Sequence, residues 1–244
     1  MPNFAEELAP RSFETQPRVD PTKGAKEVRD MPDYGGGSIE GDTDDPGPDH
    51  VKRLREIFKT MLILSYEPAA RAQSEAAALG LTMDIELSTE NTYVYFDHQS
   101  DFPLIVHRGS MTASDWLLED ALILTGLVAL TSSPRNAVGA EITRLVEEKY
   151  GQPADAFGHS LGGRVAEVSG ASGYVFTYNK AAGLGDIAAP TRPRQTDYRN
   201  KKDIVSLLSE TQTHPLPIKY VGEDESLFNS HGLGILPETV ERRE

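Results

Sequence analysis

The sequence predicts an α/β fold with a mostly parallel central sheet flanked by helices, and three observations lead to this prediction. From residue 51 onward, short runs rich in β-branched and aromatic residues alternate with longer stretches that carry apolar residues at helical spacing. A short polar link separates the first two strand-like runs, which favours an antiparallel hairpin before the parallel strands. Residues 1–50 show neither pattern and differ from the rest of the chain in composition.

Residues 1–50 are predicted to form an extended N-terminal tail. They contain 7 prolines and 6 glycines, and their 12 acidic and 5 basic residues account for half of the net charge of −14. A segment so rich in charge, glycine and proline cannot bury enough apolar surface to offset the entropy lost on ordering. We therefore expect an acidic tail at 1–50, disordered alone or bound to a partner, and one folded domain at 51–244.

Composition excludes several classes of function. The excess of 38 acidic over 24 basic residues argues against a nucleic-acid partner, because phosphate binding needs a basic surface. The chain has no cysteine, which excludes disulfides, thiolate catalysis and cysteine-bound metals. The first 18 residues show no secretory signal, and the longest apolar run, 121–130, is too short to span a bilayer. We expect a soluble protein, cytoplasmic or part of a larger assembly.

The first predicted elements are two helices and a hairpin. Pro68 can open the second helix, which is rich in alanine and which Gly80 closes. Residues 92–96 and 103–107 form the two strands of the predicted hairpin. The first helix begins near residue 51, and its apolar residues share one face: Val51, Leu54, Ile57, Phe58, Met61 and Leu62.

The later elements alternate helix and strand. Helices are expected at 115–124 and 138–149, followed by a short strand that ends at Phe157 and a helix that begins at Leu161. Three more strands complete the sheet, at 173–178, 196–199 and 218–221. This order predicts one layered α/β domain without internal repeats.

One sequence motif, between a predicted strand and the helix after it, predicts a catalytic residue. Residues 158–162 have the sequence Gly-His-Ser-Leu-Gly, the G-x-S-x-G pattern of a nucleophile elbow. In such a turn a serine in strained backbone geometry lies between a strand and a helix, with its hydroxyl at the positive end of the helix. Glycine on either side removes the Cβ atoms that would clash. Ser160 is therefore a candidate nucleophile, although a plain Gly/Ser turn would show the same letters.

The candidate base is one of two histidines. A serine hydroxyl needs a base, usually a histidine oriented by a carboxylate, and in α/β-hydrolases the acid and then the histidine follow the serine along the chain. Downstream of Ser160 the sequence has two histidines, His214 and His231. Spacing gives His231 a slight preference, because it lies in a glycine-containing loop late in the chain, whereas Pro215 fixes an extended chain at His214.

The candidate acid is Asp203, which follows a predicted strand and could reach the site from the loop there. The same side chain could cap the short helical segment that begins at residue 204, and the two roles can coexist. Chain order leaves three other aspartates open, namely Asp186, Asp197 and, for His231 alone, Asp224.

The oxyanion hole needs N–H donors aimed at the developing negative charge. One is expected from the backbone of Leu161, the residue after the candidate nucleophile. The second should come from the turn that ends an earlier strand, His107-Arg108-Gly109-Ser110, where Ser110 offers both a backbone N–H and a hydroxyl. An ordinary turn would also explain these residues.

With these residues assembled, the chain resembles the class 3 lipases, the group of fungal triacylglycerol lipases and plant lipase-like proteins. The resemblance covers roughly residues 85–236 and lies in the order of four motifs. These are the R-G-S turn with the segment after it, the elbow, the acid motif at 198–205, and the segment that ends at His231. The sequence around His214 resembles a non-catalytic segment of the family, which selects His231 as the base.

The chain also departs from the family pattern. The proline usual in the segment after Tyr178 is missing, and Ile235 or Leu236 replaces the aromatic residue usual after the histidine. There are no disulfides and no signal peptide, unlike the secreted fungal enzymes. The compact interval between Asp203 and His231 suggests a small pocket, which favours ester hydrolysis over long-chain lipase activity.

The resemblance implies an α/β-hydrolase fold with Ser160 as nucleophile, His231 as general base and acid, and Asp203 as the orienting carboxylate. It assigns Ser110 and Leu161 to the oxyanion hole and implies no metal or organic cofactor.

In fungal members of the family a short helix after the R-G-S turn forms a lid over the acyl site. The equivalent segment here is 111–122, with Trp116 as its large apolar residue. A single tryptophan is often an ordinary packing residue, so Trp116 is a candidate lid or acyl-site residue by analogy. The adjacent apolar residues 122–130 could line an acyl groove, but filling the core is the more common role.

These observations predict a serine esterase or lipase that hydrolyses carboxylic esters, with lipid acyl esters as expected substrates and a lipid surface as a candidate contact. An acyltransferase or thioesterase would use the same triad. The rival interpretation is a catalytically weak, lipase-like binding or structural protein that docks on a protein partner or assembly through residues 1–50.

Overall fold

The structure is a computed structural model of the 244-residue chain, and it describes residues 46–110, 134–183, 186–203, 205–221 and 231–237. The predicted tail up to residue 45, the helix predicted at 115–124, the candidate lid at 111–122 with Trp116, and Asp224 lie outside the described residues.

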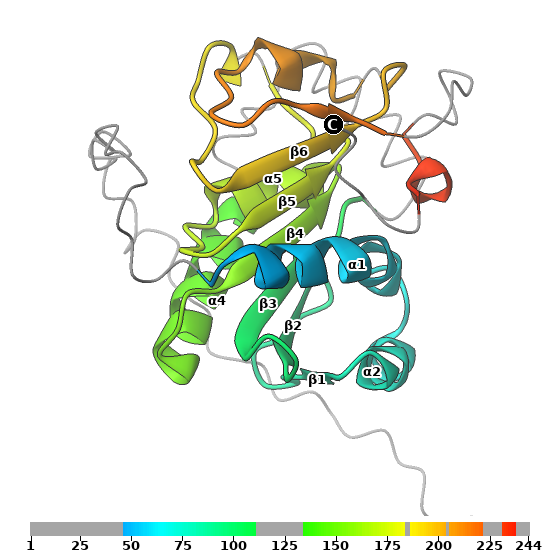
Figure 1. Ribbon diagram of the computed structural model, residues 1–244, viewed down its shortest axis with the longest axis vertical. Coiled ribbons are helices and arrows are strands. Elements are labelled where there is room, and N and C mark those ends of the chain that lie inside the picture. The colour runs from blue at the N-terminus through cyan, green and yellow to red at the C-terminus, as the bar shows by residue number, and fades with distance from the viewer. Residues whose placement is uncertain (1–45, 111–133, 184–185, 204, 222–230, 238–244) are drawn as a thin grey trace, which may run out of the picture. The chain divides into compact units, whose positions relative to one another are not determined.

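A seven-stranded sheet forms the centre of the described domain (Figure 1). Its strands lie side by side in chain order: β1 (Leu81–Met83), β2 (Thr92–Asp97), β3 (Phe102–His107), β4 (Asp155–His159), β5 (Val175–Tyr178), β6 (Gln195–Arg199) and β7 (Lys219–Tyr220). The pairings β1–β2 and β2–β3 are antiparallel, and those from β3 to β7 are parallel. The predicted α/β class is confirmed, as is a mostly parallel sheet that begins with an antiparallel hairpin.

Helices cover both faces of this sheet. The helix α1 (Pro48–Leu64) lies across one face (Figure 1), with α2 (Ala69–Ala78) packed against α1 and β1. On the opposite face lie α4 (Pro134–Tyr150) and α5 (Leu161–Val168), the helices before and after β4. Two short 3₁₀ turns, η3 (Leu207–Thr211) and η4 (Leu233–Ile235), follow β6 and β7.

An aromatic cluster joins α1 to the sheet. Phe58 lies edge-on to Phe157 and Phe176, with ring centroids 4.9 and 5.6 Å apart, and those two rings stack on each other at 5.6 Å. Tyr198 extends the cluster to β6, 5.2 Å from Phe58. Burying each phenylalanine stabilises the fold by about 1.5–3 kcal/mol. The apolar face predicted for this helix is confirmed by its buried residues: Leu54, Ile57, Phe58, Met61 and Leu62.

Alternation along β4 separates the two layers. Phe157 belongs to the α1 side, whereas the adjacent Ala156 packs with Ala166 of α5 on the other side. Small side chains on the second side let α5 lie close to the strands, which matters for the turn between β4 and α5.

Several elements differ from the predictions. The helix α1 begins at Pro48 instead of near residue 51, β5 begins at Val175 instead of 173, β6 begins at Gln195 instead of 196, and β7 spans Lys219–Tyr220 instead of 218–221. The strand β1 was missed, because three residues directly after a helix are too few to show an alternating pattern. The helix α4 begins at Pro134, four residues before the predicted start at 138, since proline is well accommodated in the first turn of a helix.

The carboxyl ends of the parallel strands meet at one edge of the sheet. There the chain leaves β3 at Arg108, β4 at Ser160, β5 at Asn179 and β6 at Asn200. Open parallel sheets place their binding sites outside this edge. The candidate site residues described next lie on these turns or contact them.

Candidate active site

Ser160 lies at a strained turn between β4 and α5. Its φ of 56° and ψ of −126° place a non-glycine residue in the left-handed half of the backbone map, which costs about 1–3 kcal/mol. Four backbone hydrogen bonds hold this conformation. The Ser160 N–H donates to the Tyr178 carbonyl at 3.1 Å, and the Ser160 carbonyl accepts from the N–H groups of Gly163 at 2.9 Å, Arg164 at 3.3 Å and Ala181 at 3.1 Å. The turn is thus fixed by β5 and by its own helix.

Both glycines of the motif are required by close contacts. A Cβ atom on Gly158 would lie 2.2 Å from the carbonyl oxygen of Gly162, and one on Gly162 would lie 2.2 Å from the carbonyl oxygen of His107. Separations this short do not occur in proteins, and backbone atoms cannot rotate away as side chains do. The first turn of α5 therefore lies directly against β4 and the end of β3.

His231 and Asp203 form a hydrogen-bonded pair. The imidazole Nδ1 of His231 lies 2.9 Å from Asp203 Oδ1, and both side chains are buried. Burial raises the pKa of Asp203, but hydrogen bonds from His231 and from the Ser206 and Val205 N–H groups outweigh it, so the pKa is lowered. The carboxylate therefore stays ionised, contacts the imidazole of His231 and also caps the turn that follows it.

The alternative histidine and aspartates lie elsewhere. His214 pairs with Asp197, with 3.2 Å between Nδ1 and Oδ2, and Asp186 pairs with Arg164 at 2.5 Å. Both pairs belong to a buried ion cluster between α5, β5, β6 and the turns after them. His214 and His231 therefore contact different aspartates, whereas spacing in the sequence gave only a slight preference between them.

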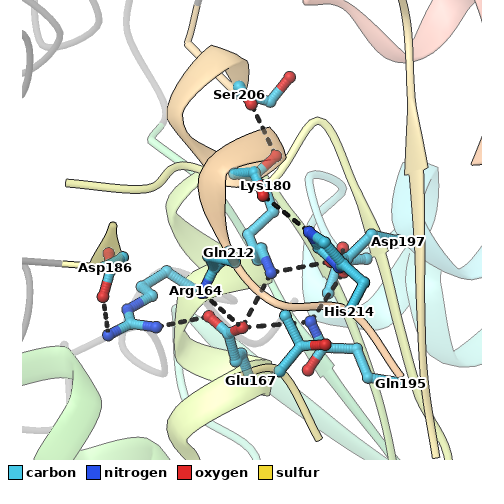
Figure 2. A network of polar contacts seen from close by, with 12 residues as sticks. Arg164, Glu167, Lys180, Asp186, Gln195, Asp197, Ser206, Gln212 and His214 are labelled. Atoms are coloured by element: carbon cyan, nitrogen blue, oxygen red, sulfur yellow. Dashed lines mark hydrogen bonds and ion pairs between the residues drawn. The ribbon is translucent and has the colours of Figure 1, made fainter. Parts of the chain in front are cut away.

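Figure 2 shows this ion cluster. The Lys180 Nζ lies 2.8 Å from Glu167 and 2.9 Å from Asp197, and Arg164 binds Glu167 at 2.5 Å. Three positive and three negative groups balance when His214 is protonated: Arg164, Lys180 and His214 with Glu167, Asp186 and Asp197. Gln195 and Gln212 donate further hydrogen bonds to these carboxylates.

His214 is held by acceptors on both ring nitrogens. Nδ1 faces the Asp197 carboxylate, and Nε2 lies 2.7 Å from the Ser209 carbonyl oxygen. Both nitrogens must carry a proton to donate, so the geometry favours the imidazolium. The hydrogen bond to Asp197 is the main cause that raises the pKa of His214, and partial burial opposes it.

The predicted oxyanion donors flank Ser160. A Cβ atom on Gly109 would lie 3.0 Å from the Ser160 Cβ, so the turn after β3 passes directly beside the elbow. The Gly109 N–H donates to the Tyr66 hydroxyl at 2.9 Å, and Ser110 is the next residue along the turn. Leu161 is the first residue of α5, and the first N–H groups of a helix have no acceptor within the helix.

Sequence reasoning missed the ion cluster, and it assigned no role to Tyr66 or Asn179, whose side chains contact His159 and His231. Charged residues inside a predicted buried helix and strand, such as Glu167 and Asp197, are a signal that could have indicated the cluster. No sequence pattern connects Tyr66 with the elbow, because the contact spans distant parts of the chain.

No group of three or more acidic or histidine side chains suited to a metal ion occurs in the described part of the chain. Within the same residues, no helix has the length and apolar character needed to cross a membrane.

Comparison with known proteins gives a distant likeness to fungal lipases. No protein-family model and no curated protein matches the sequence. Among solved structures, a mutant form of MDLA from Penicillium cyclopium is 17% identical with a TM-score of 0.43, and the match covers 73% of this chain and 82% of that one. Lip2 lipase from Yarrowia lipolytica is 16% identical with a TM-score of 0.44, covering 77% and 86%. The native propeptide complex of Rhizomucor miehei lipase gives 14% and 0.37, covering 66% and 63%.

Because the likeness is distant, the roles assigned below rest on the geometry of this chain.

The glycine contacts predict that Gly162→Ala destabilises the fold by about 3 kcal/mol or more, the upper end of the cost of overpacking. The added methyl group meets the His107 carbonyl, which belongs to a central strand and cannot move alone. Urea unfolding followed by circular dichroism measures the change. Gly234→Ala is the matched control, because a Cβ atom there meets no atom within 4 Å, and a shift under about 0.5 kcal/mol is expected. Equal free energies of unfolding for the two variants would contradict the close contact between α5 and β3 at Gly162.

The ion cluster predicts a pH dependence of stability that depends on His214. Its pKa is raised in the folded state, so its contribution is fully present below the unfolded pKa near 6.5 and is lost as pH rises through the higher folded value. The free energy of unfolding, measured in urea at several pH values, should therefore fall from neutral to alkaline pH more steeply in the wild type than in His214→Gln. His98→Gln removes an exposed histidine instead and should keep the wild-type slope. Parallel slopes in the wild type and His214→Gln would refute this account of the cluster.

Proposed function

We propose that this chain is a serine hydrolase that cleaves carboxylic esters through a triad of Ser160, His231 and Asp203. The observation that carries the proposal is the meeting, at one edge of the sheet, of a strained serine and a buried histidine–aspartate pair. The rings of His159 and His231 lie 4.9 Å apart, and the His159 imidazole contacts the His231 carbonyl. The pair is thereby held next to the residue that precedes Ser160.

The pairing defines which nitrogen of His231 would act. Asp203 is a carboxylate and can only accept, so Nδ1 carries the proton of the neutral imidazole. That leaves Nε2 as the nitrogen that takes a proton from the serine hydroxyl. Asp203 then stabilises the imidazolium that forms, and its lowered pKa keeps it ionised for that purpose.

The reaction would proceed in two halves. Ser160 Oγ bonds to the ester carbonyl carbon while its proton passes to His231, and the negative charge on the carbonyl oxygen is bound by the N–H groups of Leu161 and Ser110. The C–O bond to the alcohol then breaks, and His231 returns the proton to the departing oxygen. Water attacks the acyl-enzyme in the same manner, which releases the acid and restores Ser160.

Acyl esters fit the surroundings of the site. Ile187 and Leu207 lie in the segments that follow β5 and β6, and each residue is about half exposed (50% and 52%). Apolar side chains in such a place suit an acyl chain or the surface of a lipid aggregate. The substrate proposed is therefore a lipid or other acyl ester, and the segment 111–122 with Trp116 is proposed as the lid.

The nucleophile predicts a labelling result. A fluorophosphonate probe should modify the wild-type protein, and Ser160→Ala should lose both labelling and hydrolysis of p-nitrophenyl butyrate, by about 10³-fold or more. Ser172→Ala, which removes an exposed hydroxyl elsewhere, should label as the wild type does. Labelling that survives in folded Ser160→Ala, or its absence in the folded wild type, would overturn the proposed function.

The assignment of His231 as the general base predicts how kcat/KM changes at acid pH. A protonated histidine cannot take the serine proton, so kcat/KM should fall at acid pH. Burial lowers the pKa of His159 to about 3, and the pKa of Asp203 is lowered as well, so neither neighbour of His231 titrates near neutral pH. The logarithm of kcat/KM should therefore fall with a slope of one, the mark of a single ionisation. A profile that stays flat down to about pH 5 would contradict His231 as the base.

A further inference from the structure

We propose that Tyr66 is a positioning residue for this reaction, because its hydroxyl group joins the oxyanion turn to the histidine that holds the catalytic base in place. The inference rests on the proposed function and adds to it a residue from the loop after α1, on the α1 side of the sheet. Tyr66 does not belong to any of the motifs found in the sequence.

Three hydrogen bonds form a continuous chain through this hydroxyl. The Gly109 N–H donates to the Tyr66 oxygen at 2.9 Å, and the Tyr66 oxygen lies 2.7 Å from Nδ1 of His159. On the other side of the same imidazole, Nε2 lies 2.9 Å from the carbonyl oxygen of His231. The chain therefore touches the turn that carries Ser110, the residue beside Ser160, and the backbone of the base.

Each group in this chain of hydrogen bonds can be assigned as a donor or an acceptor. The His231 carbonyl can only accept, so Nε2 of His159 carries a proton and donates it. In the neutral ring Nδ1 then accepts, which makes the Tyr66 O–H the donor to it. The Tyr66 oxygen remains the acceptor for the Gly109 N–H. All donors and acceptors are satisfied in this one direction, with a neutral His159 and a protonated Tyr66.

The ionisation of both side chains agrees with this direction. Burial is the main cause that lowers the pKa of His159 to about 3, and the neighbouring His231 adds to it. Burial also raises the pKa of Tyr66 to about 12, with the Gly109 N–H acting in the opposite sense. The chain of hydrogen bonds thus keeps the same protons throughout the pH range in which an esterase works.

A second contact fixes the same carbonyl. Asn179 Nδ2 donates to the His231 oxygen at 3.1 Å, while its own Oδ1 accepts from the Asn200 N–H at 2.9 Å. Asn179 has a φ of 46°, so the end of β5 adopts an unusual conformation to present this amide. His231 is therefore held by side chains from the ends of β4 and β5, and through Asn200 by β6.

The role is positioning and not direct catalysis. The Tyr66 O–H donates to His159 and its oxygen accepts from Gly109, so its one proton is not available for the reaction. Replacing it leaves the Gly109 N–H and His159 Nδ1 without their partner and loosens the oxyanion turn and the base together. Misplacement of catalytic groups by about 1 Å can cost a factor of about 100 in rate. We therefore expect the loss to appear in kcat, with KM little changed.

Tyr93 offers a matched control for this test. The Tyr93 hydroxyl also contacts the loop after α1. Its O–H donates to the carbonyl of Glu67, the residue after Tyr66, at 2.8 Å. Tyr93→Phe therefore weakens the loop after α1 without touching the chain to His159. A purely structural role for Tyr66 predicts the same effect for both substitutions.

The experiment compares Tyr66→Phe, Tyr93→Phe and Ser160→Ala in the full-length chain, using p-nitrophenyl butyrate hydrolysis and the rate of fluorophosphonate labelling. Tyr66→Phe should lower kcat by about 10–100-fold with KM within about twofold, and slow labelling by a similar factor. Tyr93→Phe should stay within about threefold of the wild type in both. Equal kcat values for the two tyrosine variants would overturn the inference and leave the proposed function standing, whereas unchanged labelling of Ser160→Ala would overturn both.

A measurement on the wild type keeps the inference testable even where Tyr66→Phe fails to fold. Nitrogen-15 NMR of the histidines, with His159 assigned by its absence in His159→Gln, should show a neutral ring protonated at Nε2 from about pH 5 to 8. A ring protonated at Nδ1, or one that takes up a second proton in that range, would overturn the inference.

Discussion

The close passage of α5 over the ends of β3 and β4 is the contact on which the candidate site depends. Gly158 and Gly162 allow the backbones to approach until no Cβ atom would fit, and this approach bends the chain so that Ser160 adopts its left-handed conformation. The conformation costs energy locally and is offset by hydrogen bonds to β5 and to the helix itself. Because the strands lie in chain order, the same edge also receives the ends of β5 and β6, where Asn179 and Asp203 are found.

The buried ion cluster supports this edge from the α5 side of the sheet. Buried charges are costly unless they are paired, and loss of one partner typically costs about 3–5 kcal/mol. Lys180 is paired with two carboxylates, one from α5 and one from β6. These two ion pairs hold the helix that begins at the elbow in place against the strand that leads to Asp203. On the α1 side, aromatic packing around Phe58 holds the same strands.

The sequence allowed prediction of those features that arise from local patterns. The α/β class with its antiparallel hairpin, the apolar face of α1 and the steric role of the two glycines follow from local patterns, and the structure agrees with them. The order of the strands in the sheet was not predicted. Spacing gave His231 only a slight preference over His214, and the resemblance to the class 3 lipases made the choice. Spacing alone was insufficient because the pairing depends on which aspartate each histidine meets after the chain has folded. Tyr66 could not be found at all, since its contact with His159 joins residues 93 apart in the chain. Long-range polar contacts leave no periodic signal in a single sequence.

The central claim is that Ser160, His231 and Asp203 work as one unit beside two oxyanion donors. The most direct test is a crystal structure of the protein after reaction with a fluorophosphonate. We predict phosphorus bonded to Ser160 Oγ, with Nε2 of His231 within about 3 Å of that oxygen and the phosphoryl oxygen about 3 Å from the N–H groups of Leu161 and Ser110. An adduct on another residue, or a phosphoryl oxygen turned away from both N–H groups, would contradict the account.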